Sequence, residues 1–238
     1  MFQGKVILIV DDEADLREIL RDELTFEGAQ VLEAANGQIA KEIIKTNRLD
    51  AILSDIRMPG GDGATLAREI RQMHPSRPVL MLITGFADLQ SEEAYDLGAD
   101  GYVTKPFHLD ALKQHLRRLL IPFELRWTEA PFEPGQAKSF AVHQSLLETI
   151  QKGQIRMGRG GFFLQCPPKD LRSGQLVQIE FTDHKPIRAQ VRWIRGELVY
   201  GEKPGVGFEF LHLDPKLLAV LNQQFPFWFE SRSFIPRA

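Results

Sequence analysis

The sequence predicts an α/β fold: a doubly wound, five-stranded parallel sheet, followed by a small antiparallel β-barrel with a C-terminal helix. In residues 1–121, short apolar runs alternate five times with helical stretches, which is typical of an open parallel sheet with helices on both faces. In residues 122–238, short alternating runs are separated by Pro and Gly, which is typical of an antiparallel barrel. The charge also changes, from 14 basic and 20 acidic residues in the first part to 15 and 12 in the second.

The first part contains five runs that we interpret as buried strands. They are Lys5–Val10, Gln30–Glu33, Ala51–Ser54, Pro78–Ile83 and Gly101–Val103. Between the first two runs, apolar residues recur at helical spacing and Gly28 ends the predicted helix. Asn36 is placed to cap the next helix. The alternation predicts a domain over residues 1–121.

The second part begins with a stretch rich in Pro, Gly and Glu, which we interpret as a linker and lead-in segment over residues 122–153. A barrel domain is expected over residues 154–238, with strands at Gly161–Gln165, Gln175–Phe181, Arg188–Ile194 and Val206–Phe210. Asp214 and Pro215 form a cap and first-turn pair for a C-terminal helix.

Composition excludes several classes of protein. Apolar residues make up 43% and charged residues 26%, as in globular domains and unlike collagen or disordered chains. Neither a basic-then-apolar leader nor an apolar run long enough to cross a bilayer is present, and Cys166 is the single cysteine. We therefore expect a cytoplasmic protein that binds neither membrane nor DNA. The second part has no Ser/His/Asp constellation, so we expect no enzyme.

Polar side chains follow the predicted strands of the first part. Asp11 and Asp12 come after the first strand, Asp55 after the third, Thr84 after the fourth and Lys105 after the fifth. Because the carboxyl ends of parallel strands meet at one edge of a sheet, these residues should share one pocket. Three carboxylates in one pocket repel unless a cation joins them, and Mg²⁺ suits carboxylate oxygens best.

The motifs around these residues resemble a response-regulator receiver domain. They are the Asp11-Asp12 pair, DIRMPGGDG at Asp55–Gly63, Thr84-Gly85 and GYVTKPF at Gly101–Phe107. The resemblance implies that Asp55 accepts a phosphoryl group from a histidine kinase or phosphotransfer protein. It also implies a cis bond between Lys105 and Pro106.

The same resemblance assigns roles to the remaining positions. Asp12, Asp55 and the backbone carbonyl of Arg57 would ligate Mg²⁺, and Asp11 would act directly or through water. Thr84 would hydrogen-bond a phosphoryl oxygen and Lys105 would pair with the same group. Tyr102 corresponds to the aromatic switch residue, and homodimerisation through the fourth and fifth strand–helix units is common in the family.

The second part resembles a PilZ domain, a family that usually binds cyclic di-GMP. The resemblance rests on GRGGFFL at Gly158–Leu164, Gly174, QVRWIR at Gln190–Arg195 and GVGFEF at Gly205–Phe210. The family's RxxxR element is missing from residues 122–154. Its Asp/Asn-x-Ser-x-x-Gly turn is replaced by Arg156–Gly161, in which only the final glycine is kept.

Two questions about the second part stay open at this stage. Arg156, Arg159 and Gly161 could hold a nucleotide or another anion with successive backbone N–H groups, or could form an ordinary glycine-rich turn. The aromatic segment Phe225–Ile235 could pack on the barrel or dock a partner. The expected function is a two-component response regulator whose PilZ-like module contacts a downstream protein. The alternative is a phosphorylation-gated cyclic di-GMP sensor.

Overall fold

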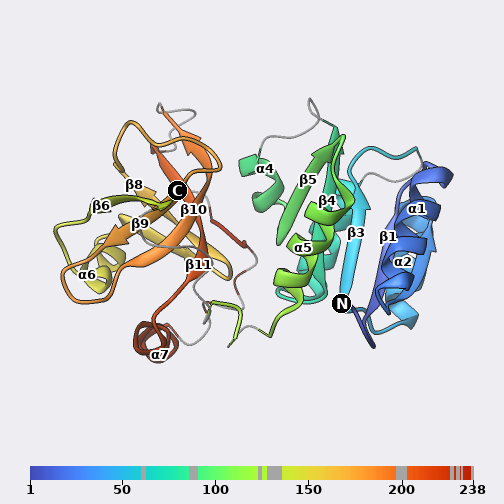
Figure 1. Ribbon diagram of the computed structural model, residues 1–238, viewed down its shortest axis with the longest axis horizontal. Helices are drawn as coiled ribbons and strands as arrows, with labels where there is room; N and C mark the ends of the chain where they lie inside the picture. Colours follow the sequence, from blue (N-terminus) through green and yellow to red (C-terminus); the bar gives the residue numbers. More distant parts are fainter. Residues whose placement is uncertain are drawn as a thin grey trace. The chain divides into compact units, whose positions relative to one another are not determined.

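The computed structural model describes residues 1–59, 63–85, 91–122, 125–127, 136–196, 203–225, 228, 231 and 233–236. The chain divides into two compact units, Met1–Ile121 and Pro122–Ala238, each with its own sheet (Figure 1). Among the described residues, none of the helices combines the length and apolar character that a membrane crossing requires.

The first unit is built on a five-stranded parallel sheet, as predicted. Its strands are β1 (Val6–Val10), β2 (Gln30–Ala34), β3 (Ala51–Asp55), β4 (Val79–Gly85) and β5 (Gly101–Lys105). Their order in the sheet is β2-β1-β3-β4-β5. β2 therefore lies on one side of β1, and the later strands are added on the other side. β3 is buried along its whole length, which explains why its apolar run shows no alternation.

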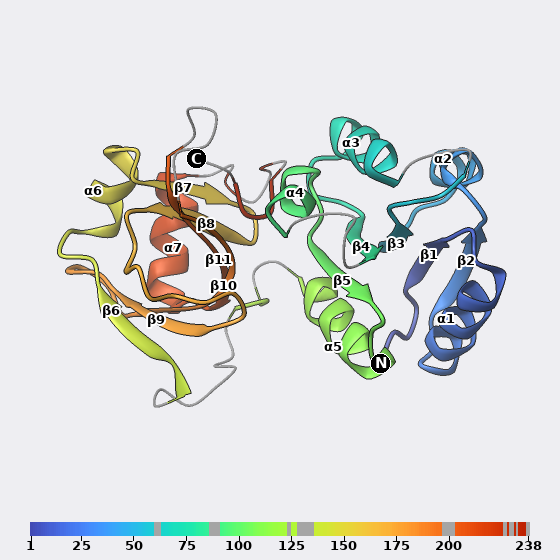
Figure 2. The same ribbon diagram turned by 90° about the horizontal axis from the view of Figure 1, so that it is seen from above.

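Helices cover both faces of this sheet. They are α1 (Ala14–Phe26), α2 (Gly37–Thr46), α3 (Gly63–Met73), α4 (Ser91–Asp96) and α5 (Leu109–Leu120). Figure 2 shows α1 and α5 on one face, with α2, α3 and α4 on the other. Asn36 caps α2 as expected, because its side chain accepts a hydrogen bond of 2.9 Å from the Ile39 N–H.

A buried ion pair lies at the edge of the first sheet where its strands begin. The Arg71 guanidinium, at the end of α3, donates to Asp100 Oδ2 at 2.5 Å and to the carbonyl oxygens of Gly98 and Pro78 at 2.7 and 2.9 Å. Asp100 also accepts from the Leu80 N–H at 2.7 Å. The pair therefore joins α3 to the beginnings of β4 and β5.

The second unit holds a six-stranded sheet in the order β6-β9-β10-β11-β8-β7. Its elements are β6 (Lys138–Ala141), α6 (Leu146–Gln151), β7 (Ile155–Gly158), β8 (Gly161–Gln165), β9 (Leu176–Glu180), β10 (Ile187–Arg195), β11 (Gly205–His212) and α7 (Pro215–Gln224). All pairs are antiparallel except β6–β9, which is parallel.

The segment expected as linker and lead-in contributes directly to this second unit. It supplies β6 and α6, and the buried Trp127 stacks on Trp228 with ring centroids 5.9 Å apart. The Trp127 carbonyl accepts a hydrogen bond of 3.0 Å from the Leu213 N–H. The short edge strands β6 and β7 were not anticipated, since four residues of mixed polarity give little alternation signal.

The core of the second unit is strongly aromatic. Phe162 stacks on Phe208, with 5.2 Å between ring centroids, and Phe210 meets Trp228 edge to face at 5.8 Å. Of the predicted aromatic segment, Phe227 and Phe229 lie outside the described residues. Trp228 packs into the core, where its indole N–H donates to Asn222 Oδ1 at 2.9 Å. The described part of this segment thus folds back on the barrel.

Candidate functional site

The polar residues predicted to converge lie at one edge of the first sheet. Asp11 directly follows β1, Asp55 ends β3 and Lys105 ends β5, while Thr84 is the penultimate residue of β4. The strand register aligns these residues across the sheet, because Asp55 pairs with Ile83 and Lys105 pairs with Gly85. The parallel topology therefore produces the cluster that the strand ends predicted.

Lys105 is the centre of this cluster. Its Nζ lies 2.7 Å from Asp55 Oδ2 and 3.2 Å from Asp11 Oδ2. A third acidic partner is Glu13, whose Oε1 is 2.7 Å away. One ammonium thus joins carboxylates from the ends of β1 and β3. The bond between Lys105 and Pro106 is cis, as the resemblance implied.

Backbone hydrogen bonds orient the two buried carboxylates. Asp11 Oδ1 accepts from the Glu13 N–H at 2.8 Å, and Asp55 Oδ1 accepts from the Arg57 N–H at 3.2 Å. The Asp11 carbonyl accepts from the Arg17 guanidinium at 2.7 Å, which holds the loop between β1 and α1. One oxygen of each carboxylate is therefore held by backbone while the other faces Lys105.

Burial sets the electrostatics of the cluster. Asp11 is 0% exposed and Asp55 is 6% exposed. Burial raises the pKa of the Asp11 carboxyl above its ordinary value, although the Glu13 N–H and the Lys105 charge oppose that shift. Burial also disfavours the charged form of Lys105, but hydrogen bonds to Asp55 and Glu13 outweigh it and raise the pKa of this ammonium. The neighbouring carboxylates therefore favour the ammonium form of Lys105.

The carboxylates fit a divalent metal ion. Asp11, Asp12 and Asp55 each offer a carboxylate oxygen, and these oxygens lie within 4.8 Å of one another. Asp12 is exposed, so an ion bound here would keep contact with water. All-oxygen donors with retained water are what Mg²⁺ prefers. The structure leaves the predicted role of the Arg57 carbonyl untested.

The two predicted switch residues lie near the site on β4 and β5. Thr84 is fully buried, and its hydroxyl donates to the Gly85 carbonyl at 3.0 Å. Tyr102 is half-buried and meets Tyr95 of α4 edge to face, with ring centroids 5.8 Å apart. Their roles in a conformational change stay predictions.

Two features of the site were missed in the sequence. Glu13 provides the third carboxylate on Lys105, and its position directly after the Asp11-Asp12 pair was the available signal. Gly63 begins α3 against the end of β3, where a Cβ atom would lie 2.0 Å from the Asp55 carbonyl oxygen. A glycine is therefore required for the close approach of α3 to Asp55.

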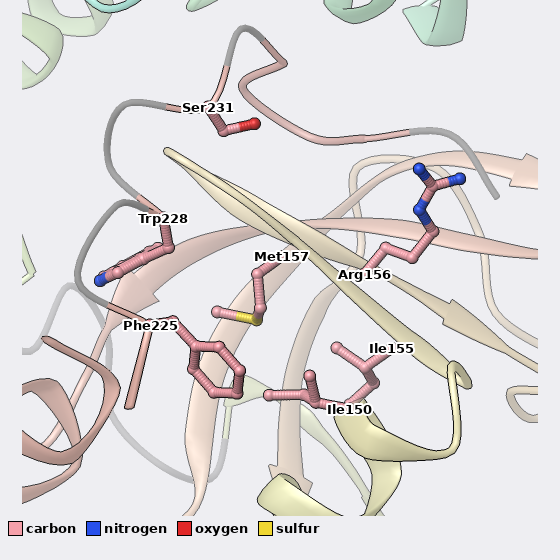
Figure 3. A pocket seen from close by; sticks show the side chains of 7 residues that line it. All are labelled: Ile150, Ile155, Arg156, Met157, Phe225, Trp228 and Ser231. Carbon is pink, nitrogen blue, oxygen red and sulfur yellow. The ribbon is translucent and has the colours of Figure 1, made fainter. Parts of the chain in front are cut away.

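In the second unit, Arg156 and Arg159 differ in how far their side chains are buried. Arg156 is exposed and lines a cavity of about 490 Å³ beside Ile150, Met157 and Phe225. Figure 3 shows its guanidinium directed away from those apolar side chains. Arg159 is only 3% exposed, and its guanidinium donates to the Ser231 carbonyl at 3.0 Å. Arg156 thus lines the cavity, whereas the buried Arg159 guanidinium binds a main-chain carbonyl.

Gly161 has a structural reason to be glycine. It begins β8 opposite Glu209 of β11, and a Cβ atom there would lie 1.9 Å from the Phe208 carbonyl oxygen. The close approach of β8 to β11 accounts for this glycine without a ligand. A nucleotide-binding role for Arg156, Arg159 and Gly161 stays a prediction.

Comparisons with known proteins match both units. A family model of the response regulator receiver domain matches residues 7–117, and one of the PilZ domain matches residues 155–225. The phosphate regulon transcriptional regulatory protein PhoB of Pseudomonas aeruginosa is 37% identical over 134 residues, 56% of this chain and 58% of that protein. The response regulator MprA of a Mycobacterium species (strain KMS) is 39% identical over 114 residues, 48% of this chain and 50% of that protein.

A solved structure is also similar to the first unit. The response regulator TrrA of Thermotoga maritima, in complex with Mg²⁺ and beryllofluoride, is 36% identical and covers 48% of this chain and 98% of its own, with a TM-score of 0.45. The present chain spans about half the length of the curated relatives that it matches. It carries a response regulator receiver domain over residues 7–117, followed by a PilZ domain over residues 155–225.

Proposed function

We propose that this protein is a two-component response regulator in which Asp55 accepts a phosphoryl group and thereby controls the PilZ module. One observation carries the proposal: Lys105 Nζ lies within 3.2 Å of carboxylate oxygens of both Asp55 and Asp11. The donor would be a phosphohistidine of a histidine kinase or a phosphotransfer protein. Asp55 is almost buried yet reaches the edge of the sheet, where such a donor can approach.

The transfer is an in-line displacement at phosphorus. The Asp55 carboxylate oxygen forms the new P–O bond while the P–N bond to the donor histidine breaks, and that electron pair returns to the imidazole nitrogen. Mg²⁺ held by Asp11, Asp12 and Asp55 would supply positive charge to the phosphoryl oxygens. Lys105 then exchanges its contact with the carboxylate for one with a phosphoryl oxygen, without changing its own charge.

The phosphoryl group changes the charge at Asp55 from about −1 to about −2 and adds three acceptor oxygens. We expect Thr84, on the neighbouring strand β4, to donate its hydroxyl proton to one of them after releasing the Gly85 carbonyl. Tyr102 would move into the space that Thr84 leaves, and its contact with Tyr95 extends the change to α4. Homodimerisation through this face stays a prediction.

For the output, we favour contact with a protein over binding of cyclic di-GMP. The RxxxR element is missing, and Arg159, one of the two arginines beside the glycine turn, is buried against the Ser231 carbonyl. A guanine-binding arginine fork contributes about 1–3 kcal/mol of discrimination, and the RxxxR element that supplies such forks in the family is missing from residues 122–154. The dinucleotide sensor is therefore the second candidate.

Acetyl phosphate with Mg²⁺ tests the receiver function directly. The intact mass of the wild-type protein should rise by one phosphoryl group, and the Asp55→Asn variant should show no increase. Asp110→Asn provides a matched control, because this carboxylate is 86% exposed on α5, outside the site. Equal phosphorylation of the wild type and Asp55→Asn would refute the proposal.

A further inference from the structure

The turn between β7 and β8 is in contact with the C-terminal segment of the chain, here defined by its described residues, Ser231 and Ser233–Pro236. The Arg159 N–H donates to the Ser233 carbonyl at 3.1 Å, and the Gly160 N–H donates to the Phe234 carbonyl at 2.9 Å. The Arg159 guanidinium donates to a third carbonyl of the segment, that of Ser231, at 3.0 Å. The N–H groups that the sequence offered as an anion site thus bind main-chain carbonyls.

The glycines of this turn leave space for the same segment. A Cβ atom on Gly160 would lie 2.0 Å from ring carbons of Phe234. A Cβ atom on Gly158 would lie 2.6 Å from the Phe234 carbonyl oxygen and 2.7 Å from that of Ser233. Because glycine has no side chain, these two positions leave room for the backbone and the aromatic ring of the C-terminal segment.

Arg159 completes a pocket for the aromatic ring. Its guanidinium carbon lies 5.7 Å from the centroid of the Phe234 ring, within the range of a cation–π contact. The segment is held by main-chain hydrogen bonds and by two buried side chains, Phe234 at 0% and Ile235 at 1% exposed, and its described residues form no strand of the sheet. Main-chain bonds plus a pocket for one side chain are how an exposed sheet margin binds an extended peptide.

We infer that the β7–β8 turn is a peptide-binding site whose built-in occupant is the chain's own C-terminal segment. When that segment leaves, the site binds an extended segment of another protein that carries an aromatic residue in the place of Phe234. This inference rests on the proposed function, in which the PilZ module contacts a protein. The C-terminal segment is tethered to the site, so its effective concentration there is high and it competes strongly with a segment of another protein. It therefore covers the turn until it is released.

A fluorescent peptide with the sequence of residues 231–238, SRSFIPRA, tests the inference by anisotropy on the full-length protein. The Phe234→Ala variant should bind the peptide at least tenfold more tightly than the wild type, because its own segment no longer fills the ring pocket. A peptide with Ala in place of Phe should bind neither protein. Adding Gly160→Ala to Phe234→Ala should abolish binding, since the new methyl group takes the place of the ring.

Matched variants separate these outcomes from a loss of folding. Phe234→Leu keeps an apolar side chain and should show intermediate peptide affinity, and circular dichroism reports whether each variant is folded. Phe26→Ala, at an 89% exposed position of the first unit, should bind the peptide as weakly as the wild type does. Absence of peptide binding to folded Phe234→Ala and Phe234→Leu would overturn the inference.

The nature of the ligand is tested in the same assay. Cyclic di-GMP added in excess should leave the peptide bound to Phe234→Ala, and displacement by the dinucleotide would overturn the assignment of the turn to peptides. The assay requires neither Mg²⁺ nor phosphorylation of Asp55. Its failure would therefore leave the receiver function standing, and failure of phosphorylation would leave the peptide result unaffected.

Discussion

Lys105 Nζ lies 2.7 Å from Asp55 Oδ2 at the carboxyl edge of the receiver sheet. The two residues are fifty positions apart in the chain, yet both are the last residue of their strands. The ammonium compensates the charge of Asp55, the proposed acceptor, and lies where a phosphoryl group on Asp55 would need a cation. The proposed phosphoryl transfer therefore depends on this contact.

Replacing the Lys105 ammonium should separate metal binding from phosphoryl transfer. We expect Lys105→Met to retain Mg²⁺ binding, because the three carboxylates remain, while phosphorylation by acetyl phosphate slows about a hundredfold, as on loss of one transition-state donor. Isothermal titration with Mg²⁺ and the time course of intact mass measure the two effects. Lys113→Met removes a lysine paired with Glu23 on another face and should change neither. Normal phosphorylation kinetics in Lys105→Met would exclude this lysine from the mechanism.

A methyl group at Gly63 should displace the backbone of Asp55, the proposed acceptor. Its Cβ would lie 2.0 Å from the Asp55 carbonyl oxygen, so either α3 or the end of β3 must shift. We expect Gly63→Ala to lower the free energy of unfolding by about 1–3 kcal/mol, as in other overpacked sites, and to slow phosphorylation. Urea unfolding and intact mass measure these effects. Gly196→Ala is the control, because a Cβ atom there meets nothing within 4 Å; equal behaviour of the two variants would contradict the argument.

The sequence was sufficient to predict the receiver site because its residues occur at strand ends. Parallel strands bring such positions to one edge whatever the details of packing, so the order of strands and polar residues along the chain was enough to place Asp11, Asp55 and Lys105 together. The pairing of Arg71 with Asp100 could not be predicted in this way. These residues are 29 positions apart, and neither carries a local pattern that distinguishes a buried ion from a solvated one.

The β7–β8 turn shows the other limit of sequence reasoning. Its three glycines suggested a nest of N–H groups for an anion, and the pattern alone cannot tell an anion from a carbonyl oxygen as the acceptor. The acceptors come from Ser233 and Phe234, more than seventy residues further along the chain. Only the tertiary fold brings them to the turn.

Removing one partner of the buried Arg71–Asp100 ion pair should destabilise the receiver unit. Arg71→Met leaves the Asp100 carboxylate buried without its cation, which we expect to cost about 3–5 kcal/mol of unfolding free energy. All three tryptophans lie in the second unit, so far-ultraviolet circular dichroism should show the loss while tryptophan fluorescence changes little. Adding Asp100→Leu should recover part of the loss. A single variant as stable as the wild type would show that the pair is dispensable.

Asp50 should give the receiver unit a defined acid sensitivity. Burial opposes its ionisation, but the Val6 N–H and the Lys5 ammonium outweigh burial and hold the pKa of this carboxyl below its ordinary value of 3.8. Its stabilising effect is therefore complete above about pH 3.8 and is lost as the pH falls through the lowered pKa. We expect Asp50→Asn to unfold more easily than the wild type at pH 7, by about 1 kcal/mol. In urea titrations this difference should close below pH 3.8, and a gap that widens on acidification would contradict the assignment.

Trp127 tests whether the lead-in segment is part of the second unit's fold. The residue is 1% exposed, stacks on Trp228 and meets Phe210 edge to face at 5.5 Å. We therefore expect Trp127→Ala to lower the unfolding free energy of this unit by about 3–5 kcal/mol, the usual cost of emptying an aromatic core position. Leu125, two residues earlier, is 58% exposed, so Leu125→Ala should change the unfolding free energy little. Comparing the two variants shows whether the effect comes from the burial of Trp127 or from any change in this part of the chain. If both variants unfold at the same urea concentration as the wild type, the segment is an independent linker; a loss confined to Trp127→Ala makes it a structural part of the PilZ unit.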